Sequence, residues 1–525
     1  MPSLLAIVAS FVLPLIVYVR SLDGGIGFWD TGEMQTVPYI AGIGHPTGYP
    51  TFIILGWLFS HAIPIGSVAW RMTFMCALCY ASSSLALYVF ARRERAREIP
   101  ALLAALCFAL APAVWSHATH TDVFAVTVLA SSIVLLLLQR WRSSHTTPVL
   151  ACAGLVFGVA LGNQLSIVWL LPGILLYAFV QRRSLRISAL AASVGSAILG
   201  AFVYAYLPLR SAANFAARRD PTLALGIPPG RPIWDYAHPA KIQNALWLVS
   251  GAQVHAASSL QNLLDFKNLA SGLPRVAALF WHGSSPLLAL LALVGVAILL
   301  ARKWRWGIIL LAFALAAWPF IVLFPQETEP MRYLLVPIWL AAAFGATALD
   351  AAGPYVGGVV GALVLALELI AGRSLFGLPA DHLGQTYVAT VVAATPPNAI
   401  IVAPWVLATP LAYAAYVDHS TGERILDIGF LPDDAKRIPA WVRARPVYVV
   451  QYATPSVPGL SFHLIHRLNV DPDLARDAKI WRVSAMRTTA PSSSAARRSP
   501  RRGAHPRRMV SPFRRRCVRT HRAAG

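Results

Sequence analysis

The sequence predicts an all-α polytopic membrane protein with a small external α/β domain toward its C-terminus. Three observations lead to this fold class. Hydrophobic residues make up 57% of the 525 residues and charged residues only 13%, too few charges for an ordinary soluble domain. Apolar stretches long enough to cross a bilayer recur along residues 1–372. Beyond that point the apolar runs become short and are separated by turn residues, which is typical of strands.

About eleven spans are predicted, because about twenty apolar residues cross the hydrocarbon of a bilayer. The candidate spans are residues 3–20, 67–90, 100–115, 122–139, 148–162, 164–180, 188–207, 276–300, 306–324, 332–349 and 354–372. We interpret the first stretch as a retained span rather than a signal peptide, since it has no basic segment ahead of it and no small-residue cleavage site.

The short connections between these spans sort by charge. Arginine and lysine gather in four connections that fall on one side of the membrane: residues 92–97, 140–142, 182–186 and 302–305. Three connections on the other side contain neither residue type: 21–66, 112–121 and 325–331. The positive-inside rule therefore predicts a cytoplasmic N-terminus and an external first loop. An odd number of spans then places the segment after residue 372 outside as well.

Three domains follow from these patterns. Residues 1–372 form the membrane domain, with a first external loop at 21–66 and a large external loop at 208–275. Residues 373–490 form the external α/β domain, with strands expected at 399–402, 424–428, 447–451, 462–468 and 480–484 and a helix at 408–417. Residues 491–525 form a disordered basic tail.

The tail also explains the high net charge of the chain. It holds eleven arginines and no acid, so it contributes half of the net charge of +22. We therefore do not expect nucleic acid as a partner; a solvated tail, or one that touches lipid headgroups, accounts for the charge.

The first external loop carries the residues that point most clearly to chemistry. Asp30 and Glu33 lie in it, although carboxylates near lipid are costly. On a helix their spacing would place both on one face, where neighbouring carboxylates tend to raise the pKa of one of them, as a general base needs. Two solvated loop acids, or acids at a helix N-terminus, would have the same spacing.

A rigid turn follows in the same loop. His45-Pro46-Thr47-Gly48-Tyr49-Pro50 combines two prolines and a glycine with an imidazole and a phenol. Such a turn could present His45 and Tyr49 to a ligand. A plain turn that leads into the next span would use the same prolines and glycine.

Together these segments resemble a known first-loop signature. The order Asp, small residue, Gly, Glu, followed about a dozen residues later by Gly-Xxx-Xxx-His-Pro-Xxx-Gly-Tyr-Pro, resembles a bacterial membrane family of originally unknown function. That family is related to the vertebrate transmembrane O-mannosyltransferase that acts on plexin-type domains, and it belongs with the C-type (GT-C) membrane glycosyltransferases. The resemblance covers residues 28–53 most strongly.

Three later stretches resemble the family in the same order. They are Asp122-Val123-Phe124, where the family has Glu-Val-Tyr or Glu-Val-Phe; Leu161-Gly162-Asn163-Gln164, where it has Gly-Asn-His; and Tyr206-Leu207-Pro208-Leu209-Arg210, where it has Tyr-Leu-Pro-Xxx-Arg. Asp122 is one methylene shorter than Glu, and Gln164 does not titrate as His does. The resemblance implies that Asp122 and Asn163 help to bind substrate, together with His45 and Tyr49.

The resemblance implies transfer of a sugar, possibly mannose, from a polyprenyl-phosphate carrier to an acceptor hydroxyl on the extracytoplasmic face of a bacterial inner membrane. The acceptor would be a protein or a glycan. A carboxylate that takes the proton of the hydroxyl accelerates such a displacement about a hundredfold or more. We expect Asp30 to be this base, with Glu33 assisting it or positioning the acceptor.

The leaving lipid phosphate requires a guanidinium at the membrane surface. Arg210 and Arg332 lie on the predicted external side, and each is a candidate. Snorkelling, or pairing of Arg332 with Glu327 and Glu329, would be an ordinary structural explanation.

His117, His120 and Asp122 cluster in one short connection and raise the question of a metal. We expect them to line the ligand or to support the structure, because no fourth ligand stands at a matching spacing. No metal site is therefore assigned, and whether the reaction uses a divalent metal stays open.

Two other functions are compatible with many spans. A transporter or flippase for a lipid-linked intermediate tends to carry ionisable groups inside its spans and to show internal repeats. Here the charges gather in the external loops and no repeat is found. A scaffold built on the α/β domain would not need eleven spans as an anchor.

Overall fold

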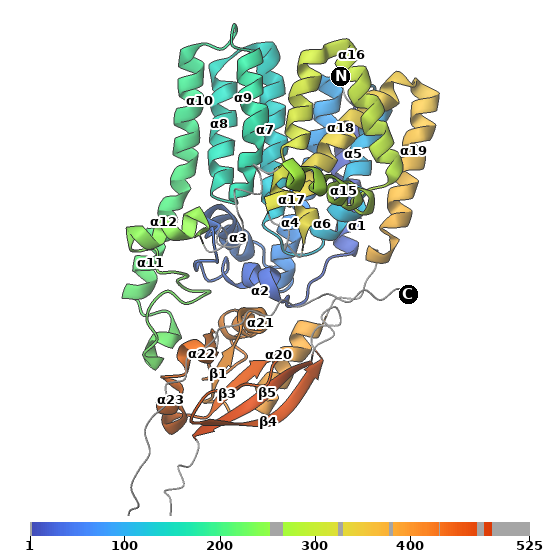
Figure 1. Cartoon of the computed structure of the whole chain (residues 1–525). Coiled ribbons are helices and arrows are strands. Elements are labelled where there is room, and N and C mark those ends of the chain that lie inside the picture. Colours follow the sequence, from blue (N-terminus) through green and yellow to red (C-terminus); the bar gives the residue numbers. More distant parts are fainter. Residues whose placement is uncertain are drawn as a thin grey trace, which may run out of the picture. The chain divides into compact units, whose positions relative to one another are not determined.

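The computed structural model describes residues 3–252, 266–323, 329–376, 382–429, 431–469 and 477–485. A bundle of helices comes first in the chain, and a small unit of strands and helices follows it (Figure 1). The chain up to Ala485 forms one compact unit, so the bundle and the α/β part belong to one folded body. The predicted tail at 491–525 lies outside the described residues.

Many helices ahead of the α/β unit overlap predicted spans, whereas α2, α3 and α12 lie in segments predicted as external loops. In the first half they are α1 (Leu4–Arg20), α2 (Trp29–Thr36), α3 (Pro50–Ala62), α4 (Val68–Arg93), α5 (Glu98–Leu110), α6 (Pro112–Ala118), α7 (Phe124–Ser144), α8 (Thr147–Leu161), η1 (Leu165–Leu170), α9 (Leu171–Val180), α10 (Ile187–Ala201) and η2 (Phe202–Ala205). There follow α11 (Tyr206–Ala216), η3 (Pro221–Leu225), α12 (Ile242–Ser250), α15 (Phe266–Gly283), α16 (Pro286–Leu315), α17 (Trp318–Leu323), η4 (Pro330–Leu334), α18 (Leu335–Ala351), α19 (Pro354–Ala371) and η5 (Arg373–Leu375).

The predicted count of eleven spans is not confirmed. Among the described residues, six helices are long and apolar enough to cross a membrane, or seven if the bent pair α5 and α6 counts as one span. Five further apolar helices have only 10–17 residues. Sequence scanning joined segments that the backbone separates: α5 and α6, for example, meet at an angle of 62° where Pro112 begins the second helix.

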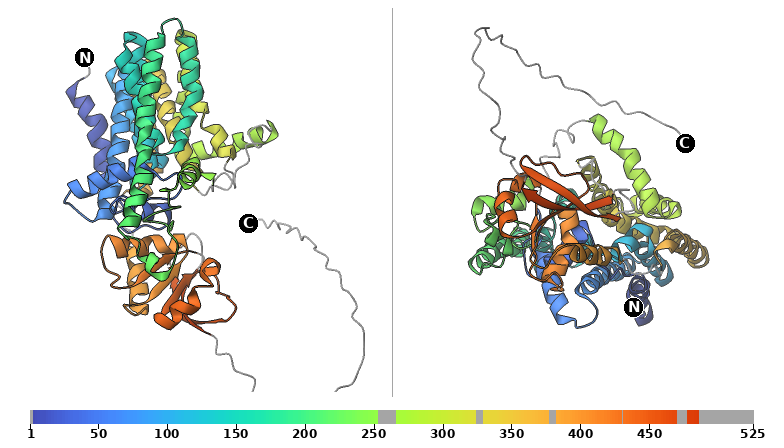
Figure 2. Two further views of the ribbon diagram at one scale, coloured as in Figure 1. Left: turned by 90° about the vertical axis from the view of Figure 1, so that its left-hand side faces the viewer. Right: turned by 90° about the horizontal axis from the view of Figure 1, so that it is seen from below.

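The region predicted as spans 276–300 and 306–324 is also organised differently. The predicted span 276–300 begins too early, because residues up to Gly283 belong to α15. This helix lies crosswise to the long helices (Figures 1 and 2). Ser285 then caps a new helix by accepting a hydrogen bond from the amide of Leu288. Within α16 the backbone leaves helical geometry at Lys303 (φ −144°, ψ 54°), so α16 consists of two limbs that meet there.

The α/β unit confirms the strands expected from the sequence. Its elements are α20 (Leu383–Ala394), β1 (Ile400–Ala403), α21 (Trp405–Tyr416), β2 (Ile425–Ile428), α22 (Leu431–Asp434), α23 (Ile438–Ala444), β3 (Val447–Gln451), β4 (Leu460–Asn469) and β5 (Asp477–Ala485). The strand order is β2-β1-β3-β5-β4, in which β2, β1 and β3 are parallel and β5 and β4 are antiparallel.

Alternation along the strands gives this sheet two buried faces. In β1, Ile401 packs with residues of α20 and α21, while Ile400 and Val402 pack with residues of α23. The loop at 208–275 also contributes to the second face, since the indole of Trp441 donates to the carbonyl of Leu225 at 3.0 Å. This loop is therefore built partly into the α/β unit.

The first loop, residues 21–66, is held between the bundle and the α/β unit. Its helix α2 contacts α21 (Figure 1). A Cβ on Gly32 would lie 2.2 Å from the carbonyl oxygen of Gly27 and 3.0 Å from the Oγ1 of Thr409, so the glycine between the two acids of the motif allows this close contact. The amide of Ala69 donates to the hydroxyl of Tyr413 at 2.9 Å and ties α4 to the same helix.

Candidate functional site

Helix α2 places the two acids of the motif in different surroundings. The predicted helix is present, with Asp30 in its first turn and Glu33 one turn later. The side chain of Asp30 is 45% exposed, whereas that of Glu33 is 0% exposed. Each carboxylate has a cationic partner of its own: Arg332 for Asp30 and His45 for Glu33. The expectation of two carboxylates that act as a pair is therefore replaced by two separate ion pairs.

Glu33 organises the turn that follows it. Its Oε1 accepts the amide of His45 at 2.9 Å, and its Oε2 lies 2.6 Å from the Nδ1 of the same residue. The Nε2 of His45 lies 2.9 Å from the hydroxyl of Tyr49, which donates to the carbonyl of Pro46 at 2.9 Å. Tyr49 donates its single proton to the Pro46 carbonyl, so the imidazole must supply the proton for the hydrogen bond between Nε2 and the Tyr49 oxygen. The hydrogen bond to the Glu33 carboxylate requires a second proton, on Nδ1.

The charge on His45 follows from the same contacts. Burial alone would lower its pKa, but the negative charges of Glu33 and then Asp30, with the hydrogen bond to Glu33, raise the pKa from 6.5 to about 9. His45 is therefore a cation at neutral pH. Burial, with the nearby Asp30 charge, also raises the pKa of Tyr49 well above its usual value, which keeps its hydroxyl protonated as the hydrogen-bond pattern requires.

Asp30 faces a cavity of about 810 Å³. Three parts of the chain meet around it: the first loop, the loop at 208–275 and the α/β unit. The lining residues that matter here are Asp30, His45, Arg231, Tyr236, Trp247, Trp405 and Asp433. The cavity therefore combines a carboxylate with aromatic rings, as expected of a pocket for a polar organic ligand.

Arg332 pairs with Asp30 but is not itself among the residues that line the cavity. Its Nη1 is 3.5 Å from the Oδ2 of Asp30 and 4.0 Å from the Oε2 of Glu329. The guanidinium also lies over the rings of Phe124 and Tyr333, at 5.4 and 5.9 Å from their centroids. The side chain of Arg332 is 16% exposed, so this cation is partly desolvated. Its partner Asp30 is the more exposed of the two acids of the motif. The predicted partner Glu327 lies outside the described residues.

Trp405 was not predicted as a site residue. It begins α21, and its ring lies edge-on to Trp29 at 6.1 Å and to His45 at 5.5 Å between centroids. Trp247 and Arg231 were missed as well, because nothing in the sequence of the loop at 208–275 sets them apart. Only the fold shows that these residues share one cavity with Asp30.

Two of the predicted binding residues support the backbone instead of facing this cavity. The amide of Asn163 donates to the carbonyl of Val123 at 2.8 Å and to the Oγ1 of Thr127 at 2.9 Å, and its side chain is buried. Arg210 donates to the carbonyls of Ala41 and Ile40 at 2.5 and 3.2 Å. Neither is among the residues that line the cavity.

Asp122 lies with two histidines in a buried cluster beside the first loop. Its Oδ2 is 2.8 Å from the Nδ1 of His117, and the hydroxyl of Thr31 donates to the carbonyl of Thr121 at 3.3 Å. Burial alone would raise the pKa of Asp122, but the hydrogen bond and charge of His117 hold it at about 2. Among the described residues, His117, His120 and Asp122 could together hold a metal ion, since their ligand atoms lie within 4.8 Å of one another.

Comparisons with known proteins agree with this picture. Residues 30–188 match the family described as Protein O-mannosyl-transferase TMEM260 N-terminal domain, a match that begins at Asp30. Protein O-mannosyl-transferase TMEM260 from Mus musculus is 29% identical over 214 residues, which cover 39% of this chain and 29% of the relative. The protein of the same name from Dictyostelium discoideum is 30% identical over 133 residues, covering 25% of this chain and 16% of the relative.

The fold also has solved counterparts. The crystal structure of ArnT from Cupriavidus metallidurans bound to undecaprenyl phosphate has a TM-score of 0.54 at 12% identity, over 90% of this chain and 97% of that one. Its apo state gives a TM-score of 0.51 at 13% identity, with the same coverage. The chain thus shares the fold of these two ArnT structures, and its residues 30–188 are similar to the N-terminal domain of TMEM260, although it spans less than a third of the length of either curated relative.

Proposed function

We propose that this protein is a membrane glycosyltransferase that moves a sugar from a polyprenyl-phosphate donor to an acceptor hydroxyl. The observation that carries the proposal is the pairing of Asp30 with Arg332 beside a cavity of about 810 Å³. One of these groups suits proton removal and the other suits a phosphate. The relation to TMEM260 and the likeness to a structure that holds undecaprenyl phosphate support the same assignment.

The reaction assigns a different task to each member of the pair. The acceptor hydroxyl gives its proton to the carboxylate of Asp30 while its oxygen forms a bond to the anomeric carbon. The bond from that carbon to the phosphate oxygen breaks, and the lipid phosphate leaves with the electron pair. Arg332 stabilises the charge that develops on the phosphate. The donor phosphate thus replaces Asp30 as a partner of Arg332 and leaves the carboxylate available as the base.

Glu33 and His45 act on this site by positioning. Glu33 is buried and both of its carboxylate oxygens bind His45, so it does not contact the acceptor. The ion pair fixes the turn at 45–50, whose members His45 and Pro46 form part of the cavity wall. Tyr49 holds the other end of the imidazole. The imidazolium adds positive charge to the cavity, which favours a phosphate-bearing donor.

The aromatic residues of the cavity are assigned to the acceptor or to the transferred sugar. Trp405 and Trp247 present flat apolar faces near Asp30, and such faces pack against the C–H side of a sugar ring. The sugar in TMEM260 is mannose according to its name, and we extend mannose to this chain as part of the proposal. The acceptor is a protein or a glycan.

The charge of the connections supports an orientation for this activity. Arginine and lysine gather on the side opposite the first loop, so we place the N-terminus in the cytoplasm and the cavity with the α/β unit outside. In a bacterium this is the outer face of the inner membrane. Asp433 lines the cavity and is exposed, so it is a suitable position for a labelling test of this orientation. A cysteine at that position should react with an impermeant reagent on spheroplasts.

Replacing Asp30 by Asn tests the chemistry. The variant keeps the shape of the side chain but removes the base, so transfer from polyprenyl-phosphate mannose in proteoliposomes should fall at least about a hundredfold. Asp23→Asn is the matched control in the same loop, since its amide oxygen can still accept from Gly25. Wild-type transfer by Asp30→Asn at normal expression would refute the assignment. Movement of the intact lipid-linked sugar across the bilayer without transfer would indicate a flippase instead.

A further inference from the structure

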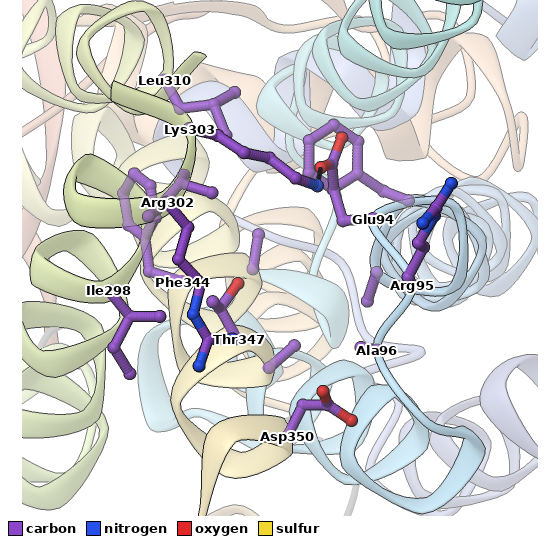
Figure 3. A pocket seen from close by; sticks show the side chains of 15 residues that line it. Glu94, Arg95, Ala96, Ile298, Arg302, Lys303, Leu310, Phe344, Thr347 and Asp350 are labelled. Carbon is purple, nitrogen blue, oxygen red and sulfur yellow. Dashed lines mark hydrogen bonds and ion pairs between the residues drawn. The ribbon is translucent and has the colours of Figure 1, made fainter. Parts of the chain in front are cut away.

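A second cavity lies at the end of the bundle away from the candidate site. It has a volume of about 220 Å³ and is formed by α4 with the turn after it, both limbs of α16, and α18 (Figure 3). Helix α4 begins beside the first loop, where the hydroxyl of Ser67 donates to the carbonyl of Gly24. Since the 26 residues of α4 span about 39 Å, the cavity at its other end lies at the opposite membrane surface from Asp30.

The wall of this cavity is apolar on one side and charged on the other. The apolar side consists of Phe90, Ile298, Leu299, Leu310 and Phe344. The charged side consists of Glu94, Arg95, Arg302, Lys303 and Asp350. An apolar wall that continues into a charged rim at the membrane surface matches the two halves of a phospholipid.

Both acids of the rim are already paired. Glu94 accepts from the Nη2 of Arg142 at 2.6 Å and from the Nζ of Lys303 at 2.8 Å, as Figure 3 shows for the lysine. Asp350 accepts from the Nε of Arg97 at 2.8 Å. The two acids therefore do not neutralise any further cation of the rim.

Two guanidinium groups remain at the cavity. Arg95 and Arg302 form no ion pair with any residue in the described ranges, although both line the cavity. Figure 3 shows Arg302 extending from α16 toward Thr347 on α18. Together with the paired cations, the rim carries a clear surplus of positive charge.

The backbone at Arg95 has a conformation that is unusual for an arginine. Arg95 has φ 75°, in the left-handed region that L-residues rarely adopt. It follows the end of α4, where the amide of Ala96 returns to the carbonyl of Ala91 at 3.1 Å. Glycine takes this position without strain in most helices that end in this way. An arginine here accepts strain and keeps a positive charge at the rim, on the other side of the pocket from Arg302 (Figure 3).

From these contacts we infer that the cavity binds the headgroup of an anionic phospholipid of the membrane. Arg302 receives the phosphate, Arg95 adds a second positive charge at the rim, and the apolar side receives the first carbons of an acyl chain. Basic pockets between membrane helices bind such headgroups in general. A free phosphate would satisfy the guanidinium groups but would leave the apolar wall beside them unused, so the lipid is the occupant the cavity favours.

The test uses the full-length protein purified in a mild detergent and native mass spectrometry. Phosphatidylglycerol and phosphatidylcholine of the same acyl chains are offered in equal amounts. We expect the wild type to retain phosphatidylglycerol preferentially, and Arg95→Ala with Arg302→Ala to reduce that retention at least about fivefold for each arginine removed. Arg302→Lys, which keeps the charge, should restore part of the retention when compared with Arg302→Ala.

A matched control removes the same charge elsewhere on the same surface. Arg140 and Arg183 are not among the residues that line the cavity. The double variant Arg140→Ala with Arg183→Ala should therefore retain phosphatidylglycerol as the wild type does. Equal loss in both double variants would show a diffuse surface charge and overturn the site. Glycerol phosphate in place of the lipid is the second arm: binding as tight as that of the lipid would assign the cavity to a soluble phosphate instead. Circular dichroism of each variant separates lost binding from lost folding.

Discussion

The ion pair between Glu33 and His45 makes stability depend on pH in a direction that can be worked out. The pKa of His45 is raised from 6.5 in the unfolded chain to about 9 in the fold. At a pKa difference of about 2.5, and about 1.4 kcal/mol for each pKa unit, the protonated imidazole contributes about 3 kcal/mol. A raised folded pKa means that this contribution is complete below pH 6.5 and is lost as the pH rises through 9.

Glu33→Gln removes the charge that holds this proton. The pKa of His45 should then fall, since burial alone lowers it, and the imidazole should be neutral in the folded variant at neutral pH. The difference in unfolding free energy between the wild type and the variant should therefore shrink by about 3 kcal/mol between pH 6 and pH 10. At pH 7.5 about 2 kcal/mol of the contribution should remain. Denaturant unfolding in mixed micelles, followed by tryptophan fluorescence, measures this difference.

A second buried glutamate supplies the control. Glu94 is paired with an arginine and a lysine, Arg142 and Lys303, and not with a histidine, so Glu94→Gln should destabilise the protein by an amount that changes little between pH 6 and pH 10. The reasoning fails if the gap between wild type and Glu33→Gln stays constant over this range. It also fails if Glu94→Gln shows the same pH dependence as Glu33→Gln.

Three other variants test single contacts. Gly32→Ala should reduce transfer at least about tenfold with Asp30 intact, because the new Cβ would clash with the Gly27 carbonyl and press on the Thr409 hydroxyl of α21, so that α2 must shift; comparing transfer with protein yield checks this. Arg332→Lys should raise the KM for the lipid donor through loss of the guanidinium fork, whereas Arg210→Lys should lower the melting temperature and leave that KM near the wild-type value. Asn163→Ala should lower the free energy of unfolding by about 1–3 kcal/mol, since two hydrogen bonds are lost in a buried place, and should not change the pH profile of transfer.

Much of the fold was accessible from the sequence because it depends on local pattern. Strands of the α/β unit such as β1 are buried on both faces, so they appear in the sequence as short apolar runs bounded by turn residues. The spans were less accessible, since hydropathy averages over a window and does not register a bend such as the one at Pro112 or the break at Lys303. The sequence therefore located apolar segments well, while its count of eleven spans is not confirmed.

The candidate site was accessible only in part. The helix that carries Asp30 and Glu33 follows from their spacing, but which of the two acids is buried depends on His45, which lies twelve residues beyond Glu33 and packs on it. Arg332 is 302 residues from Asp30 in the chain, and no local pattern connects them. Trp405 lies in a unit that the sequence treats as separate from the first loop.

The different burial of the two acids explains why the motif needs both of them. A catalytic base must contact the substrate, so part of its carboxylate must be exposed. A second requirement is rigidity, and an exposed carboxylate is held less firmly than a buried one. Asp30 meets the first requirement with 45% of its side chain exposed. Glu33 meets the second, because it is fully buried and locks the turn at His45 that lines the same cavity. The close contact at Gly32 then fixes the helix that carries both acids. Reactivity and rigidity are thus assigned to two carboxylates one helical turn apart, and exchanging their environments would remove both functions.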